Sequence, residues 1–472
     1  MIGLNADLLD RFSAIVGARH ALRDQADQHA FLEEPRDRYH GKTAIVLRPK
    51  STAEVQQILQ LAHDTRTAIV PQGGNTGLVG GQIPDGSGLQ VVLSLTRLNA
   101  IRAIDPISNT IDVEAGVTLQ RVRETAEAAD RLFALSLASE GSCTIGGNIG
   151  TNAGGTSTIA YGNMRDLVLG LEVVLADGSL WRDMRHLRKD NTGYDFRGLF
   201  VGSEGTLGIV TAAVLKLYPR PRSTATAFAA VRDPAAALAL LQIAQADSRA
   251  ALVAFELIPR LGMELAVKHD LGSRDPLATA YPWYVLLELT SGAESGLNTV
   301  LEELLGDGME QGLIEDAALA SSMEQAKALW RPRESMSEVQ GREGGSIKHD
   351  VSIPVADVAA FIAEATAAVE AFLPDARVLP FGHVGDGNIH FNISQPAGGD
   401  KDAFLAHWED VNAIVHDIVA RYHGSISAEH GIGQSKLSLL PQVKDKVAMQ
   451  MMYATKQMLD PKGILNPGKL LL

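Results

Sequence analysis

The stretch PQGGNTGLVGG, residues 71–81, places five glycines directly after the apolar run AIV at 68–70. The run predicts a buried strand, and glycines in the loop that follows let backbone N–H groups converge on an anion such as a pyrophosphate. An ordinary surface loop would have the same composition. A second stretch, SEGSCTIGGNIGTNAGG at 139–155, has the same character. Two such loops in one domain favour a nucleotide-binding fold.

The elements before the first loop fit this interpretation. TAIVLRP at 43–49 predicts a strand, and STAEVQQILQLAHDTR at 51–66 predicts a helix with a Ser or Thr cap and Glu54 near its third position. No G-x-G-x-x-G occurs, which argues against a Rossmann dinucleotide fold. GILNPGKL at 463–470 has the spacing of a P-loop, but Leu470 stands where Ser or Thr is required.

Length and composition set broader limits. The 472 residues predict two or three domains, and 46% hydrophobic with 21% charged residues is typical of a globular protein. No uninterrupted apolar run is long enough to span a membrane, and residues 1–20 predict an amphipathic helix rather than a signal peptide, so we expect a cytoplasmic protein. The net charge of −14 argues against nucleic-acid binding. Cys143, the only cysteine, excludes intrachain disulfides and thiolate metal clusters.

A second region of interest is FGHVGDGNIHFN at 381–392. Strands are predicted on both sides, and Asp386-Gly387 predicts a two-residue hairpin turn. That register sets His383 directly opposite His390, with Cβ atoms roughly 4.5–5.5 Å apart, and puts Asn392 on the same face. Two imidazoles so placed suit one metal ion, although a hairpin with incidental histidines has the same sequence.

SISAEHGIG at 425–433 offers a third ligand, because Glu429 lies beside His430 between a predicted strand and a glycine-rich loop. Two histidines and one carboxylate, with coordination positions left open, are typical of a catalytic metal site. Considered alone, the Glu-His pair is better explained by a solvated loop.

Cationic side chains occur in two further segments. LWRPRESMSEVQ at 329–340 predicts the start of a helix with Pro332 in its first turn, and Arg333 and Ser337 then share a face. SIKHDVSIP predicts a strand with Lys348 and Asp350 on one face. The alternatives without a binding function are a surface charge for Arg333 and an ion pair between Lys348 and Asp350.

Four motifs together resemble the FAD-linked oxidoreductases of the vanillyl-alcohol oxidase type over nearly the whole chain: PQGGNTG, TIGGNIGTNAGG, GSEGTLGIVT and PKGILNPGK. The resemblance implies an α+β protein with a PCMH-type FAD-binding domain of two α+β subdomains at 1–220. The C-terminal tail 456–472 is expected to pack back on that domain. PRPRST at 219–224 predicts the linker to an α+β substrate-binding cap domain, 221–455, with an antiparallel sheet that carries the metal site. Its alternating pattern suggests a duplicated βαβ-type half.

The resemblance also implies how FAD is held. Some family members bind flavin covalently through a histidine of the first loop, and Asn75 stands at that place, so FAD is expected to be noncovalent. The implied FAD contacts are Pro71, Gly73, Gly74, Asn75, Thr76 and Gly77 in the first loop, Ser139, Gly141, Gly146, Gly147, Thr151, Asn152, Gly154 and Gly155 in the second, and Gly205, Ile209 and Asn466 elsewhere.

HVGDGNIHFN followed by AEHGIG is similar to FAD-dependent D-2-hydroxy-acid dehydrogenases, especially those that oxidise D-2-hydroxyglutarate. This similarity implies a divalent metal, expected to be zinc, on His383, His390 and Glu429, with His430 as the catalytic base. The substrate-binding residues implied are Arg333, Ser337, Lys348 and Asn392. Ser337 stands where the relatives have threonine, which leaves the exact acid open.

The implied reaction is oxidation of a 2-hydroxy acid to the 2-keto acid by hydride transfer to flavin N5. A D-lactate or glycolate dehydrogenase of the same family, a metal-free alcohol or sugar oxidase, and a flavin- or metal-binding protein without turnover remain alternatives. The reduced flavin requires an electron acceptor, for which an electron-transfer flavoprotein, a quinone and a cytochrome are candidates. A homodimer is compatible with the size of the chain.

Overall fold

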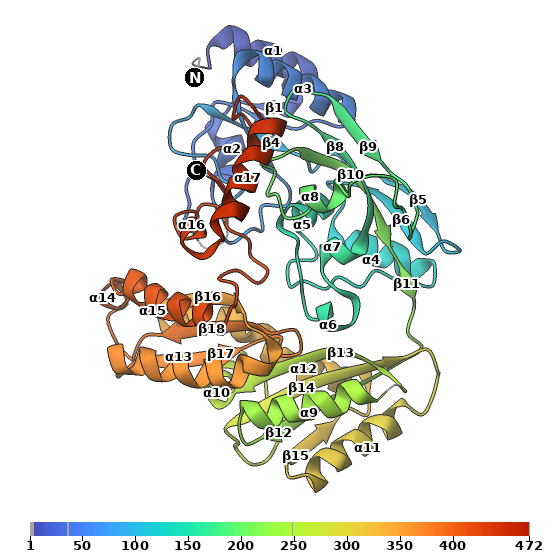
Figure 1. Ribbon diagram of the computed structural model, residues 1–472, viewed down its shortest axis with the longest axis vertical. Helices are drawn as coiled ribbons and strands as arrows, with labels where there is room; N and C mark the ends of the chain where they lie inside the picture. Colours follow the sequence, from blue (N-terminus) through green and yellow to red (C-terminus); the bar gives the residue numbers. More distant parts are fainter. Residues whose placement is uncertain (1–3, 35–36, 248, 472) are drawn as a thin grey trace. The chain divides into compact units, whose positions relative to one another are not determined.

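The structure is a computed structural model that describes residues 4–34, 37–247 and 249–471 (Figure 1). Its contacts divide the chain into two compact units. The first comprises residues 1–154, 162–220 and 429–472, and the second comprises residues 155–161 and 221–428. In the stretches that the structure describes, no helix combines the length and apolar composition needed to cross a bilayer.

The first unit contains a four-stranded sheet in the order β1-β2-β4-β3, in which β2, β4 and β3 are parallel. Helix α3 follows β2 as predicted: the Ser51 hydroxyl accepts from the Glu54 N–H at 3.2 Å, and the Glu54 carboxylate accepts from the Lys50 N–H at 2.7 Å. Helices α1 and α3 supply Phe12 and Ile58, both fully buried, to the core beside this sheet. The elements are α1 Ala6–Val16, η1 Ala18–His20, β1 Ala21–Leu22, α2 Gln25–Leu32, β2 Val46–Leu47, α3 Thr52–Thr65, β3 Ala68–Gln72 and β4 Gln90–Ser94.

A five-stranded antiparallel sheet in the order β5-β6-β10-β8-β9 completes the main part of this unit. An Asp-Gly turn, Asp177-Gly178, connects β8 and β9, and Gly178 has a φ of +83°. The remaining elements are β5 Ile101–Asp105, β6 Thr110–Glu114, α4 Leu119–Ala128, β7 Arg131–Leu132, α5 Ile145–Thr151, α7 Met164–Leu167, β8 Val168–Val174, β9 Leu180–Asp183, α8 Arg197–Phe200, β10 Ile209–Lys216 and β11 Tyr218–Pro219.

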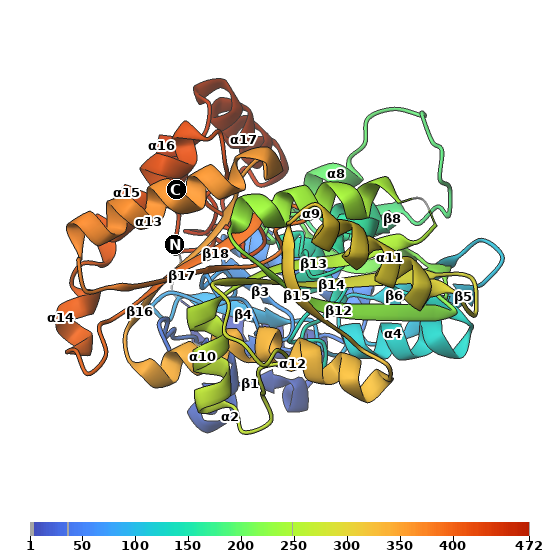
Figure 2. The same ribbon diagram turned by 90° about the horizontal axis from the view of Figure 1, so that it is seen from below.

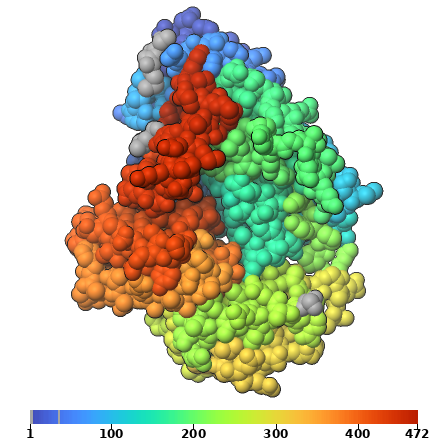
Figure 3. Space-filling model, in the orientation of Figure 1, coloured from blue at the N-terminus to red at the C-terminus, as the bar shows by residue number. Residues whose placement is uncertain are grey.

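The C-terminal segment returns to the first unit and runs beside β3, where the Ile69 N–H donates to the Ile464 carbonyl and the Asn466 N–H donates to the Ile69 carbonyl, both at 2.8 Å. The returning segment starts at residue 429, earlier than the 456 expected from sequence. The difference has a local cause, because the N–H of Gln434 already donates to the Val79 carbonyl at 2.8 Å. Its helices are α16 Leu440–Val443 and α17 Lys446–Leu459, and α17 lies at the surface in Figure 3.

The second unit is built on an antiparallel sheet in the order β13-β14-β12-β15. Its strands and helices follow as β12-α9-β13 and β14-α11-β15, two halves with one succession of elements. Figure 2 shows α9 and α11 on one face of this sheet and α10 and α12 on the other. The elements are α6 Thr158–Tyr161, β12 Ser223–Val231, α9 Pro234–Ala246, β13 Ala251–Pro259, α10 Arg260–His269, β14 Trp283–Ser291, α11 Leu297–Glu310, β15 Ile314–Leu319 and α12 Met323–Val339.

Helix α12 corrects one prediction. Pro332 was expected in the first turn of a helix, but α12 begins at Met323 and Pro332 lies inside it. The helix starts earlier because the Ser322 hydroxyl caps it by accepting from the Gln325 N–H at 3.2 Å. Arg333 and Ser337 still lie one turn apart.

A three-stranded antiparallel sheet in the order β16-β18-β17 follows. Helices α13 and α15 pack together and against this sheet, where Phe361 of α13 contacts Phe391 of β18. The elements are η2 Gln340–Glu343, β16 Ser346–Ser352, η3 Val355–Asp357, α13 Val358–Phe372, β17 Arg377–Phe381, β18 Asn388–Ser394, α14 Lys401–Leu405 and α15 Trp408–Arg421.

Candidate active site

The predicted register of the histidine hairpin is wrong. Phe381, not His383, lies opposite His390. The strand ends at Phe381 because Gly382 pairs instead with Leu257 of β13, through backbone hydrogen bonds of 2.9 and 3.1 Å. A type I′ turn at Asp386-Gly387 would need positive φ at both residues, and only Gly387 has one, at 85°. Residues 382–387 therefore form a longer loop.

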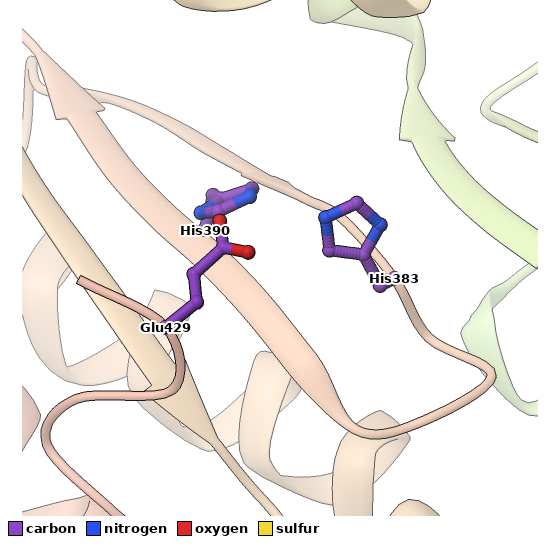
Figure 4. A group of neighbouring side chains, drawn as sticks. All are labelled: His383, His390 and Glu429. Atoms are coloured by element: carbon purple, nitrogen blue, oxygen red, sulfur yellow. The ribbon is translucent and has the colours of Figure 1, made fainter. Parts of the chain in front are cut away.

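The longer loop nevertheless brings the two histidines together. Their ring centroids lie 5.6 Å apart, and His383 is buried. One ligand atom from each of His383, His390 and Glu429 lies within 4.8 Å of the others. In Figure 4 the Glu429 carboxylate points to the space between the two rings, and one ring nitrogen of His383 faces it. The three residues chosen from sequence thus form a candidate metal site.

Backbone pairing beside β16 positions Glu429 next to the two histidines. Ser425 and Ser352 exchange two N–H···O bonds of 2.8 and 3.0 Å, and the Ala428 N–H donates to the Asp350 carbonyl at 3.2 Å. Glu429 is the next residue, and His430 follows it. Ligand atoms of Asp350, Glu429 and His430 also lie within 4.8 Å of one another. The predicted base is therefore adjacent to a predicted ligand.

The donor set suits a divalent cation. The His383 Nδ1 atom lies 2.7 Å from the Glu256 carboxylate, so Nδ1 carries the proton and Nε2 is the nitrogen that can bind a cation. Histidines that bind metals commonly donate their other ring N–H to a carboxylate in this way. Two histidines and one carboxylate leave coordination positions for a bound 2-hydroxy acid.

Glu256 is a site residue that the sequence analysis missed. It is fully buried on β13 and accepts from Arg333 Nε at 2.7 Å as well as from His383. Burial opposes its ionisation, but the nearby His383 and Arg333 lower its pKa to about 2. Burial raises the pKa of Asp386, in the same loop as His383, to about 6. A single acid inside the apolar strand ALVAFELIP was the available signal for Glu256.

The predicted substrate-binding residues occupy varied environments. Arg333 is buried with its guanidinium carbon 5.0 Å from the centre of the Phe381 ring, and within the described chain its two Nη atoms make no hydrogen bond. Lys348 Nζ donates to the backbone carbonyl of Ser337 at 3.0 Å, so these two residues are in contact. The Ser337 side chain itself is exposed.

Asn392 lies opposite Lys348 in the sheet and is buried. Its amide nitrogen donates to the Gln340 side chain at 2.9 Å, and Gln340 in turn donates to the Met336 carbonyl at 2.9 Å. Gln340 is fully buried and was also missed, because its role depends on the packing of η2 against β18. The amide of Asn392 is thus fixed in orientation.

The two glycine-rich loops of the first unit pack against each other. A Cβ on Gly73 would lie 2.3 Å from the Thr144 hydroxyl, and one on Gly74 would lie 1.9 Å from the Ser142 carbonyl, so only glycine allows this approach. The five backbone N–H groups of residues 73–77 donate no hydrogen bond within the described residues. The Thr144 hydroxyl is buried without a partner there. These donors fit an anionic cofactor such as FAD.

The other predicted FAD residues surround these loops or lie along them. Gly205, with a φ of +70°, packs on Pro71, and the Asn466 amide donates to the Gly81 and Glu204 carbonyls at 2.9 and 2.8 Å. Asn75 has a φ of 55°, and its amide donates to the Ala30 and Glu33 carbonyls at 3.0 and 2.8 Å. Gly155 belongs to the second unit.

Two protein families match stretches of this chain. Residues 43–183 match the family described as FAD binding domain, and residues 220–470 match the C-terminal domain of FAD linked oxidases. The chain belongs to the FAD-linked oxidases. The predicted α+β fold and the predicted FAD cofactor are confirmed at this level.

Curated relatives narrow the class. The chain is 40% identical to a protein named probable D-2-hydroxyglutarate dehydrogenase, mitochondrial, of Oryza sativa subsp. indica, over 99% of this chain and 82% of that one. It is 38% identical to D-2-hydroxyglutarate dehydrogenase of Xanthomonas citri pv. viticola, over 89% and 88%. It is 34% identical to a putative mitochondrial D-lactate dehydrogenase of Schizosaccharomyces pombe, over 97% and 89%. The chain is an FAD-dependent dehydrogenase that acts on a hydroxy acid.

Solved structures support the fold alone. p-Cresol methylhydroxylase with bound substrate has a TM-score of 0.75 at 16% identity and covers 98% of this chain and 96% of its own. Alkyldihydroxyacetonephosphate synthase has a TM-score of 0.73 at 17% identity, over 98% and 84%. Because several relatives are named mitochondrial, the expected cytoplasmic location stays a prediction.

Proposed function

We propose that this enzyme oxidises D-2-hydroxyglutarate to 2-oxoglutarate and that His383, His390 and Glu429 bind a divalent metal, with zinc expected. The observation that carries the proposal is the convergence of three ligand atoms within 4.8 Å, one of them on a histidine whose Nδ1 atom lies 2.7 Å from a buried carboxylate. Curated relatives named for D-2-hydroxyglutarate support the choice of substrate.

Each residue of the proposed site has a separate role in the reaction. When bound, FAD accepts the hydride from C2, and the divalent cation polarises the substrate hydroxyl and its neighbouring carboxylate. His430 accepts the hydroxyl proton, because a neutral imidazole near physiological pH is suited to that role. Asn392, held by Gln340, offers a fixed amide to the substrate.

The distal carboxylate of D-2-hydroxyglutarate would be bound by cations. The Arg333 guanidinium presents its two Nη atoms as a fork for a planar carboxylate, and Lys348 adds a mobile point charge. The electrons then leave through an acceptor that is an electron-transfer flavoprotein, a quinone or a cytochrome. The putative D-lactate dehydrogenase among the relatives favours D-lactate as the second candidate substrate, which has no distal carboxylate.

An anaerobic flavin-bleaching screen tests both candidates on a preparation analysed for metal. We expect D-2-hydroxyglutarate, but not its L form, to bleach the flavin of the metal-loaded enzyme. Treatment with a chelator should abolish this bleaching, and added Zn²⁺ should restore it. Full bleaching after complete removal of metal would contradict the metal role. Bleaching by D-lactate alone would favour the second candidate.

A further inference from the structure

Glu256 lies in the interior of the second unit, where burial of a carboxylate costs free energy. It is the only acid in β13, and its side chain is completely inaccessible to solvent. A buried carboxylate is tolerated only when charged or polar partners compensate for its lost hydration. Glu256 has two such partners, one for each oxygen, at equal distances of 2.7 Å.

The two partners come from different elements of the second unit. Oε1 lies 2.7 Å from the Nδ1 atom of His383, in the loop after β17, and Oε2 accepts from the Nε atom of Arg333 on α12. Arg333 also stacks on Phe381, whose ring centroid lies 5.1 Å from that of His390. One carboxylate therefore connects a proposed metal ligand to a proposed substrate-binding arginine.

We propose that Glu256 is a positioning residue that sets both the metal affinity of His383 and the carboxylate-binding orientation of Arg333. The inference rests on the proposed metal-dependent function and deepens it. Accepting the Nδ1 proton fixes the tautomer and the ring angle of His383, which leaves the Nε2 lone pair for the cation. Accepting the Nε proton of Arg333 turns its Nη fork away from Glu256 and toward a ligand.

A purely structural ion pair makes a different prediction. It would lower thermal stability when broken and would leave the affinity of the folded enzyme for metal and substrate unchanged. Glutamine separates the two roles, because His383 and Arg333 face different carboxylate oxygens and one of these positions becomes an NH₂ group, which cannot accept. The matched control is Glu288→Gln on the neighbouring strand β14, whose carboxylate accepts from Thr226 at 2.8 Å and Trp330 at 2.9 Å.

The first measurement is zinc affinity, which does not depend on turnover. Wild type, Glu256→Gln, Glu288→Gln and His383→Ala, each with bound FAD, are titrated with Zn²⁺ against a fluorescent chelator. Removal of a carboxylate that supports a metal-bound histidine typically weakens metal affinity ~10–100-fold. We expect that loss for Glu256→Gln, a larger loss for His383→Ala and none for Glu288→Gln.

The second measurement is KM at saturating zinc. We expect Glu256→Gln to raise KM for D-2-hydroxyglutarate and to leave KM for D-lactate unchanged, because only the longer acid needs Arg333. Wild-type zinc affinity in Glu256→Gln would overturn the first half of the inference, and unchanged KM values would overturn the second. If Glu256→Gln loses FAD or melts early, Glu256→Asp, which keeps the charge on a shorter arm, takes its place. A wild-type enzyme that binds neither zinc nor another divalent cation would overturn the proposed metal-dependent function itself.

Discussion

Lys348 illustrates how the structure changes the interpretation of a single residue. The sequence left the choice of acid open because Ser337 stands where the resemblance implies a threonine. In the structure Lys348 Nζ donates to the backbone carbonyl of Ser337, so a methyl group on the side chain at position 337 would leave this hydrogen bond intact. The ammonium group itself is therefore the better probe of specificity.

At this scale we predict that Lys348→Met raises KM for D-2-hydroxyglutarate ~10–100-fold, because a charge-assisted hydrogen bond contributes about 1.5–3 kcal/mol. KM for D-lactate should not change, since that acid has no distal carboxylate. Steady-state kinetics with both acids measure the difference, and Lys327→Met on the exposed face of α12 is the matched control. Equal increases in KM for both acids would show that Lys348 does not bind the distal carboxylate.

Individual helices and strands could be predicted where the sequence signal is local, but the pairing between strands could not. The helix after Ser51, the strand around Lys348 and the strands flanking the histidines follow from capping and alternation. The hairpin register failed because Gly382 pairs with Leu257, which lies far away in the sequence. Glu256 was visible as an acid in an apolar strand, but its partners come from two other elements. Sequence patterns therefore indicated the candidate ligands and missed the residues that hold them.

The histidine loop provides a prediction at the scale of an element. A Cβ on Gly387 would lie 2.1 Å from the Ile353 carbonyl, and the Gly387 carbonyl accepts from the Ile353 N–H at 2.9 Å. Gly398 has a similar positive φ, 73° against 85°, with no neighbour within 4 Å of such an atom. Both alanine variants incur backbone strain of about 1 kcal/mol.

Only Gly387→Ala adds a collision, so we expect its melting temperature to fall further than that of Gly398→Ala and its zinc affinity to weaken. Differential scanning calorimetry and zinc titration of the two variants provide the comparison. Equal melting temperatures and equal zinc affinities would show that the loop adapts without moving His383.

At the scale of the whole molecule, one half-buried acid helps to hold the segment by which the chain returns to its first unit. Glu204 lies in the GSEGT motif, and its carboxylate accepts from the N–H groups of Ile432 and Gly433 at 2.7 and 2.8 Å. Its own carbonyl accepts from Asn466 at 2.8 Å. Three segments thus meet at Glu204. More than two hundred residues separate Glu204 from Ile432, and helices α16 and α17 separate Gly433 from Asn466. Together with the hydrogen bond from Gln434 to Val79, these contacts explain why the returning segment begins earlier than residue 456.

We predict that Glu204→Gln loosens the loop that follows His430. The glutamine oxygen can accept from one of the two N–H groups, but its NH₂ group faces the other, which loses its acceptor. An unsatisfied buried donor costs about 1–3 kcal/mol, so the amides of Ile432 and Gly433 should exchange with deuterium ~5–100-fold faster. Glu114→Gln is the control, because that carboxylate accepts from the Ala100 N–H at 3.0 Å elsewhere in the same unit. If exchange at Ile432 and Gly433 is the same in Glu204→Gln and Glu114→Gln, the loop is held by its other contacts. Faster exchange together with a lower kcat and unchanged zinc affinity would show that Glu204 acts on the position of His430 rather than on the metal.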